Sequence, residues 1–247
     1  MSLHLVEIPL SLRALHLWAG ARKLGAQFDE GLALHHLLGE TFGPATLQPF
    51  RLMVVPRART GTLYAYAAMD DESLRRQASS SLTPAHAEVI ALDRLRSLPR
   101  PATSWFAGQK LGFDLRLRPV VRLASALAGR DEGGAEVHFG KGAEVDAFLA
   151  AVLRGKATTR EASYRDWLAE RLGAAASLDL ETTRLVSFRR KRVQRDGKRL
   201  EGPDVVLHGT LTVTDPSAFA DLLARGVGRH RSYGYGMLLL RPPQRGC

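Results

Sequence analysis

Gly226-Val-Gly-Arg-His-Arg-Ser-Tyr-Gly-Tyr-Gly236, followed at once by Met237-Leu-Leu-Leu-Arg-Pro242, is the stretch from which the organisation of this chain is best inferred. Four glycines lie within eleven residues, together with two arginines, one histidine and two tyrosines. Glycine lets a backbone approach a ligand closely, arginine and exposed backbone N–H groups bind phosphate, and a tyrosine ring can stack on a base. The composition therefore predicts a loop that holds a polyanion.

The elements around this loop argue against a dinucleotide site. Residues 215–225 before it are predicted to be a helix, with Asp215 as N-cap and Pro216 in the first turn. Residues 237–241 after it have the apolar character of a buried strand. A dinucleotide fingerprint runs from strand through G-x-G-x-x-G to helix, and its third glycine position is Arg231 here. Helix, glycine loop and strand in this order favour RNA as the ligand.

The rest of the C-terminal half places this loop in a longer pattern. Alternation of apolar and charged residues predicts strands, and apolar residues on one face predict helices. The expected order is a strand over 112–121, an inserted loop rich in glycine and charge over 129–142, a helix over 160–172, strands over 185–193 and 204–213 around a hairpin tip at 194–202, a helix over 216–225 and a strand over 237–241.

The N-terminal half gives a similar series. Leucine spacing predicts the first helix, and the glycines and Pro44 that follow it predict its end. The expected order is a strand over 3–12, a loop or short turns over 13–26, a helix over 29–40, strands over 50–55 and 62–68, a helix over 70–77 and a closing strand over 87–95.

Both halves therefore follow the order β-α-β-β-α-β of the split βαβ unit. We predict an α+β fold with two tandem ferredoxin-like (RRM-like) domains, over residues 1–98 and 111–247. A linker over 99–110 is indicated by Pro99, Pro101 and the polar residues after them. No residue-level repeat relates the halves, so the duplication is inferred from element order alone.

The charge balance indicates the class of partner. Thirty-five Lys and Arg residues against 25 Asp and Glu give a net charge of +10, which favours nucleic acid or, less often, an anionic membrane surface. No apolar run approaches the ~20 residues that span a bilayer, and residues 1–8 do not have the pattern of a signal peptide. Cys247 is the only cysteine, so no intrachain disulfide or cysteine-based zinc site is possible. We expect a soluble cytoplasmic protein with no membrane partner and no bound metal.

A second basic cluster lies on the predicted hairpin. A run of charge is usually a solvated face, but in a chain of net charge +10 with a glycine loop of this kind it is a candidate RNA contact. A hairpin here would follow the RNA backbone, since A-form grooves limit base reading. The candidate residues are Arg189, Arg190, Lys191, Arg192, Arg195, Lys198 and Arg199.

The motif Gly-x-Gly-x-x-Arg-Ser-x-Gly-x-Gly-Met-Leu at 226–238 resembles the C-terminal signature of the CRISPR repeat-processing endoribonucleases, which belong to the repeat-associated RNA-binding proteins with paired ferredoxin-like folds. Residues 113–119, 164–173 and 206–213 resemble segments of the type I-E members. The resemblance extends well over 111–241 and weakly over 1–110.

The resemblance implies a function. Such enzymes bind the stem-loop of a CRISPR repeat transcript and cut once at its base, with no metal or other cofactor. The ribose 2′-hydroxyl attacks its own phosphate and leaves a 2′,3′-cyclic phosphate. Many stay on the product as a subunit of an effector complex, so repeat stem-loop RNA and the other subunits are the expected partners. The loop residues expected to bind RNA are Gly226, Gly228, Arg229, His230, Ser232, Tyr233, Gly234 and Gly236.

One position departs from the type I-E pattern. A general-base histidine begins the first helix of those enzymes, whereas Asp29 stands there in this chain. Type IV members can lack the histidine and rely on arginines, which points to Arg22 and Lys23. His35 and His36 lie later in the same helix, where adjacent residues are expected to point to different faces, so that only one could reach the substrate. The catalytic candidates are Arg22, Lys23, His35, His36 and Arg231.

The chemistry explains this choice. Cleavage by a 2′-hydroxyl needs a base, a proton donor for the 5′-oxygen and positive charge near the phosphorane. Histidine can serve as base and donor, whereas arginine stays protonated and supplies charge only. With arginines alone we expect slow, single-turnover cleavage. Two alternatives stay open: a non-catalytic RNA-binding subunit of a CRISPR complex, and a general double-stranded nucleic-acid binder.

Overall fold

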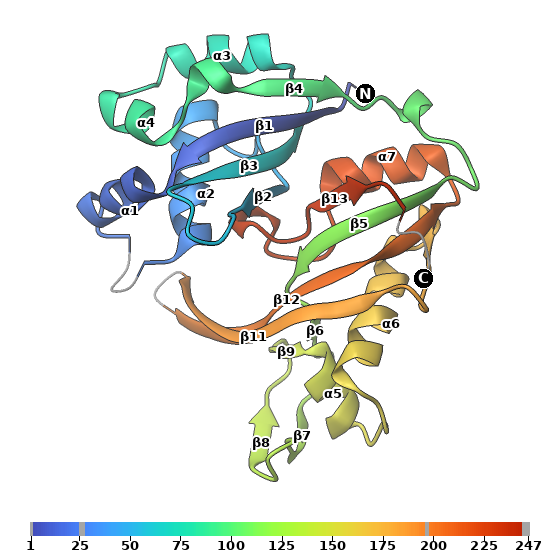
Figure 1. Cartoon of the computed structure of the whole chain (residues 1–247). Helices are drawn as coiled ribbons and strands as arrows, with labels where there is room; N and C mark the ends of the chain where they lie inside the picture. The colour runs from blue at the N-terminus through green and yellow to red at the C-terminus, as the bar shows by residue number, and fades with distance from the viewer. Residues whose placement is uncertain (1, 25–27, 196–197, 244–247) are drawn as a thin grey trace.

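The chain forms two antiparallel sheets with helices packed about them, and a smaller hairpin extends from the second sheet (Figure 1). The computed structural model describes residues 2–24, 28–195 and 198–243, and the side chains of these residues except 193–195 and 198–200. The arrangement is α+β, as predicted, and is consistent with tandem ferredoxin-like domains. The expected domain limits, 1–98 and 111–247 with a linker over 99–110, stay predictions.

The N-terminal sheet has the strand order β2-β3-β1-β4. Every second residue of β1, at Val6, Ile8 and Leu10, is buried, as the two-residue period of a strand requires. These side chains pack in one core with Leu34 and Leu37 of α2. The elements are β1 (His4–Ser11), β2 (Phe50–Met53), β3 (Thr60–Ala67), β4 (Arg96–Pro99), α2 (Glu30–Phe42) and α3 (Asp71–Ser79).

Two expectations for this half are wrong. Residues 13–26 were expected to be a loop, but α1 (Leu12–Ala21) occupies most of them. Its buried residues Leu15, Trp18 and Ala19 have helical spacing, and this packing outweighs the helix-weakening effect of Gly20. The closing strand expected over 87–95 is instead α4 (Pro84–Val89) and a 3₁₀ turn, with β4 following at 96–99, because Thr83 and Pro84 start a helix there.

The C-terminal sheet has the order β13-β5-β12, and both β10 and β11 pair with β12. Helices α6 and α7 have the predicted bounds. The strand expected over 112–121 stops at Leu117, and β6 leaves the sheet after Pro119, which cannot donate to the ladder. The elements are β5 (Lys110–Leu117), β6 (Val120–Arg122), β10 (Ala176–Leu178), β11 (Arg184–Arg195), β12 (Lys198–Val213), β13 (Leu238–Arg241), α6 (Arg160–Leu172) and α7 (Pro216–Arg225).

The basic hairpin is longer than predicted. Pairing of β11 with β12 continues through Arg192↔Glu201 to Arg195↔Lys198, so most of the tip expected at 194–202 is strand. The Asp-Gly pair at its centre, residues 196–197, lies outside the described residues. The longer ladder projects the basic run away from the sheet, toward the N-terminal half (Figure 1).

The loop expected over 129–142 is also structured. It contains most of a hairpin formed by β7 (Leu127–Arg130) and β8 (Glu136–Phe139), followed by β9 (Glu144–Asp146) and α5 (Ala147–Leu153). Leu123, Val145 and Leu149 form a small core beneath it, which outweighs the loop-favouring glycines. This insertion extends at the lower end of Figure 1.

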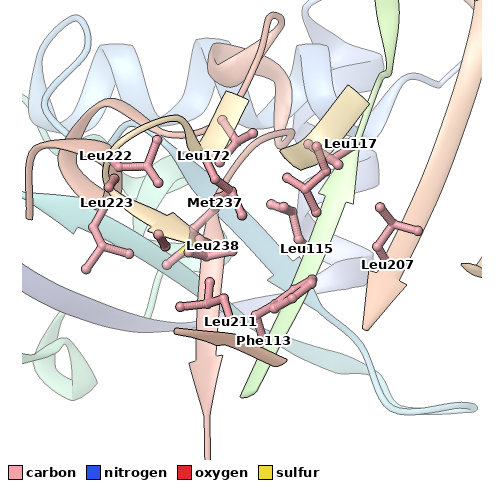
Figure 2. Packing of buried hydrophobic residues seen from close by; sticks show 14 of the residues in the cluster. Phe113, Leu115, Leu117, Leu172, Leu207, Leu211, Leu222, Leu223, Met237 and Leu238 are labelled. Carbon is pink, nitrogen blue, oxygen red and sulfur yellow. The ribbon is translucent and has the colours of Figure 1, made fainter. Parts of the chain in front are cut away.

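The core of the C-terminal sheet also joins the two halves. Figure 2 shows side chains of β5, β12, α6, α7 and β13 packed together, among them Phe113, Leu211 and Leu238. The same cluster includes Leu3, which precedes β1, and Tyr66 of β3. The Tyr66 hydroxyl donates to the Leu238 carbonyl at 3.1 Å, so the halves share buried surface. No helix in the described part of the chain is long and apolar enough to cross a membrane.

Candidate functional site

The glycine loop joins α7 to β13 and folds back on itself. The Val227 amide donates to the Gly236 carbonyl at 2.8 Å, and the Gly236 amide donates to the Arg116 carbonyl of β5 at 2.8 Å. Gly236 has φ of +79°, and a Cβ there would lie 2.3 Å from the Val227 carbonyl oxygen. Only glycine satisfies both the left-handed backbone and this close approach.

The other loop glycines permit contact with the rest of the protein. A Cβ on Gly228 would lie 2.7 Å from the Trp167 ring, and one on Gly226 would lie 2.9 Å from Pro49. A glycine outside the loop has the same role: a Cβ on Gly31 of α2 would lie 2.6 Å from the Tyr233 carbonyl oxygen of the loop. The loop thus packs between α6, the start of β2 and α2. That its glycines also contact RNA stays a prediction.

This packing forms a pocket between α2 and the glycine loop. The pocket has a volume of about 370 Å³, and His35, His36 and Ser232 line it together. The two imidazoles meet edge to face with centroids 5.4 Å apart, and the His35 ring lies 5.0 Å from the Tyr233 ring. Both histidines thus line the same pocket, and the expectation that only one of them could face a substrate stays a prediction. Neighbouring helical residues are about 100° apart, and the pocket extends around both.

Arg22 lies close to the same pocket. Its guanidinium is 2.6 Å from the Glu40 carboxylate and 4.5 Å from the centre of the Trp18 ring. Glu40 lines the pocket and also accepts from His86 Nε2 at 3.1 Å. Lys23 follows with an exposed side chain. Sequence reasoning missed Glu40 and His86 because nothing local distinguishes them, and only folding brings α1, α2 and α4 together.

The basic residues of the glycine loop have partners within the protein. Arg231 donates to the carbonyl of Arg225, at the C-terminal end of α7 where positive charge is favourable. Arg229 and His230 both contact the carboxylate of Glu144 in β9, at 2.5 and 3.0 Å. Burial lowers the pKa of His230, although Glu144 opposes the shift. The imidazole therefore tends to be neutral at neutral pH and donates through Nε2–H.

A larger groove, of about 870 Å³, lies between the N-terminal end of α2, β2 and the basic hairpin. The run Arg189–Arg192 lines it together with Arg51 and Arg116, and that this run contacts RNA stays a prediction. Two of these arginines form ion pairs within the protein: Arg189 lies 3.5 Å from Asp204, and Arg192 lies 2.7 Å from Glu201. The side chains of Arg195, Lys198 and Arg199 lie outside the described residues.

Asp29 has a structural role at the mouth of this groove. Its carboxylate accepts from the Gly31 amide at 3.1 Å, which caps α2, and lies 3.4 Å from Lys191 Nζ. Asp29, expected from the resemblance to stand where type I-E members have a histidine, thus links the start of α2 to the basic strand.

Two buried carboxylates anchor the arginines of the groove. Arg116 binds Asp204 through two bonds of 2.8 Å, and although burial alone would raise the pKa of Asp204, the bonds and charge of Arg116 keep it below the ordinary value. Asp114, with a side chain 3% exposed, lies 3.0 Å from Arg51 Nη2. These residues are isolated in the sequence, and no spacing could have revealed them. Across the described ranges, no three His, Cys, Asp or Glu side chains form a group that could hold a metal ion.

Comparison with known proteins identifies related chains. A family model described as CRISPR associated protein matches residues 3–242. The chain is 36% identical to the CRISPR system Cascade subunit CasE of Escherichia coli strain K12 over 83 residues, which is 34% of this chain and 41% of that protein. It is 33% identical to the CRISPR-associated endoribonuclease Cse3 of Thermus thermophilus over 135 residues, 55% of this chain and 57% of that protein.

The chain therefore spans about half the length of the curated relatives it matches. The likeness in structure is more extensive. A structure of Thermus thermophilus Cse3, bound to an RNA that represents a pre-cleavage complex, superposes with a TM-score of 0.63 at 20% identity and covers 98% of this chain and 100% of that one. At this identity the likeness shows a common fold.

Proposed function

The chain belongs to the CRISPR-associated protein family whose model matches residues 3–242, and from this premise we propose that it is an endoribonuclease that cleaves CRISPR repeat transcripts. It would bind the stem-loop of a repeat, cut at the base of the stem and keep the product as a subunit of an effector complex. The observation that carries the proposal is the pocket in which His35, His36 and Ser232 meet, close to a groove lined by arginines.

The two histidines of the pocket are proposed to act as acid and base, and three cations outside its lining are proposed to supply charge. One imidazole removes the proton from the ribose 2′-hydroxyl, whose oxygen bonds to the adjacent phosphorus as the bond to the 5′-oxygen breaks. The other imidazole gives a proton to that 5′-oxygen, so the products are a 2′,3′-cyclic phosphate and a 5′-hydroxyl. Arg22, Lys23 and Arg231 are proposed to stabilise the negative charge that develops on phosphorus.

The geometry of α2 connects binding with cleavage. Glu30, at the start of the helix, lines the basic groove, and His36 lines the pocket. Six residues of helix correspond to about 9 Å, which two or three nucleotides of a strand cover at ~3.4 Å each. A stem held by Arg189–Arg192 could therefore pass its strand along α2 to the histidines.

The role of Asp29 bears on which subtype of the CRISPR endoribonucleases this chain represents. The Asp29 carboxylate caps α2 and pairs with Lys191, which supports a structural role for this residue in place of the histidine that begins this helix in type I-E enzymes. We propose that the chain is the type IV variant, in which later histidines or arginines supply the chemistry. The same observation favours a second candidate function, that of a non-catalytic RNA-binding subunit.

Cleavage without metal tests the proposal directly. Purified protein in excess over labelled repeat RNA, in EDTA, should give a single cut with a 2′,3′-cyclic phosphate end. A single 2′-deoxy substitution at the cleaved nucleotide should abolish the cut and leave binding unchanged, because the nucleophile is lost. Tight binding with no cut at any protein excess would support the non-catalytic subunit. Equal affinity for unrelated duplexes would support a general nucleic-acid binder.

The salt dependence of binding tests the groove. Each phosphate contact contributes about −0.9 to the slope of log affinity against log salt for a duplex. Replacing Arg189, Arg190 and Arg192 with glutamine should reduce the slope by roughly two to three. A matched triple replacement of Arg75, Arg76 and Arg130, none of which lines the groove, should leave the slope unchanged. An equal slope in the groove variant and the wild-type protein would remove the hairpin from the interface.

A further inference from the structure

The basic groove has two walls of different chemistry. Strand β11 provides the cationic wall, Arg189–Arg192. The opposite wall is apolar and comes from Phe28 and from Leu52, Met53 and Val54 of β2 and its end. Phe28 and Val54 are 43% and 44% exposed. A duplex presents phosphates on its surface and hides its base faces, so an exposed apolar wall offers little to it.

Phe28 also has the geometry of a stacking platform. Its ring lies 3.8 Å from the His16 ring, centroid to centroid, with an interplanar angle of 24°. The His16 imidazole is held in place because Nδ1 donates to the Leu12 carbonyl at 2.8 Å. A carbonyl only accepts, so Nδ1 carries the proton. Phe28 therefore has one face supported by a fixed aromatic ring while it lines the groove.

We propose that this groove contains a subsite for an unpaired nucleotide, with its base stacked on Phe28 and its phosphate toward Arg189–Arg192. Proteins that bind single strands combine a cationic groove for the backbone with aromatic rings for the bases. The ion pair between Asp29 and Lys191 joins the two walls next to Phe28. The inference rests on the proposed function: the nucleotide belongs to the single-stranded flank of the repeat stem-loop.

Two RNAs test the subsite: the repeat stem-loop with its single-stranded flanks, and the same stem-loop without them. Phe28→Ala should weaken binding of the flanked RNA roughly tenfold, the loss expected for one stacked base, and change binding of the unflanked RNA less than twofold. Phe106→Ala is the matched control, because Phe106 is 63% exposed and does not line the groove. It should change neither affinity.

A tryptophan variant supplies a direct readout. The three native tryptophans are buried, at 5%, 9% and 4% exposure, so Phe28→Trp places an exposed indole in the groove. It should keep wild-type affinity, and flanked RNA should quench its fluorescence more than unflanked RNA. An equal effect of Phe28→Ala on both RNAs, or equal quenching by both, would overturn the subsite while the proposed function stands. Failure of the wild-type protein to bind either RNA would overturn both.

Discussion

Replacing His35 and His36 together with alanine is expected to slow single-turnover cleavage of repeat RNA by about 10²–10⁴-fold, the usual contribution of general acid–base groups. Both imidazoles line the pocket beside Ser232, and their rings are in contact. If one acts as base and the other as acid, each single variant should already show most of the loss, because groups that act as a unit are not additive. The measurement is the cleavage rate in EDTA with protein in excess.

Two controls separate a loss of chemistry from a loss of binding or folding: the RNA affinity of the double variant, and a variant of a histidine outside the pocket. The double variant should bind repeat RNA within about threefold of the wild-type protein, since its loss lies in the chemical step. His138→Ala removes an exposed imidazole from β8, away from the pocket, and should cleave at the normal rate. If the double variant also cleaves normally, the histidines are not catalytic, and Arg22, Lys23 and Arg231 remain as sources of charge stabilisation.

Gly236→Ala is expected to destabilise the protein by about 3 kcal/mol or more. The new Cβ would lie 2.3 Å from a backbone carbonyl oxygen, and φ of +79° adds strain for any residue with a side chain. Relief would require movement of Val227, which donates to the Gly236 carbonyl. At roughly 2–4 °C per kcal/mol for a chain of this size, thermal unfolding should occur about 10 °C lower.

Gly20→Ala is the matched control for this effect. Gly20 lies in α1, and nothing lies within 4 Å of an added Cβ. Alanine there should raise stability by about 0.5–1 kcal/mol, because glycine weakens a helix. A melting temperature of Gly236→Ala within 2 °C of the wild-type value would show that the glycine loop can adjust, and its glycines would then need another explanation.

Helices α6 and α7 illustrate what local sequence predicts well. Thr159 and Asp215 cap them, and Gly173 and Gly226 end them, so their bounds depend on neighbouring residues only. Helix α1 was missed for the opposite reason. Its charges and Gly20 suggested a loop, and the burial of Leu15 and Trp18 that stabilises it arises from tertiary packing.

In the candidate site, too, some residues could be found from local sequence and others only from the folded structure. The basic run Arg189–Arg192 is continuous in the sequence and could be singled out there as a candidate RNA contact; the structure places it along the groove, and its contact with RNA stays a prediction. The histidine pocket was not predictable, because His35 and Ser232 are almost two hundred positions apart and meet only where the glycine loop packs against α2. The carboxylates Asp114 and Asp204 likewise gain their importance from burial beside arginines of other strands.

The α+β class, the capped helices α6 and α7 and the cationic hairpin follow from the sequence alone, because they depend on residue spacing, local hydrogen bonds and charge. Tertiary structure decided that the loop glycines serve close packing between the two halves, that both histidines share one pocket, and that Asp29 caps a helix. Each of these depends on distances between segments remote in the chain. The glycine loop could be recognised from its residues, but the surface it contacts is set by the packing of the two sheets.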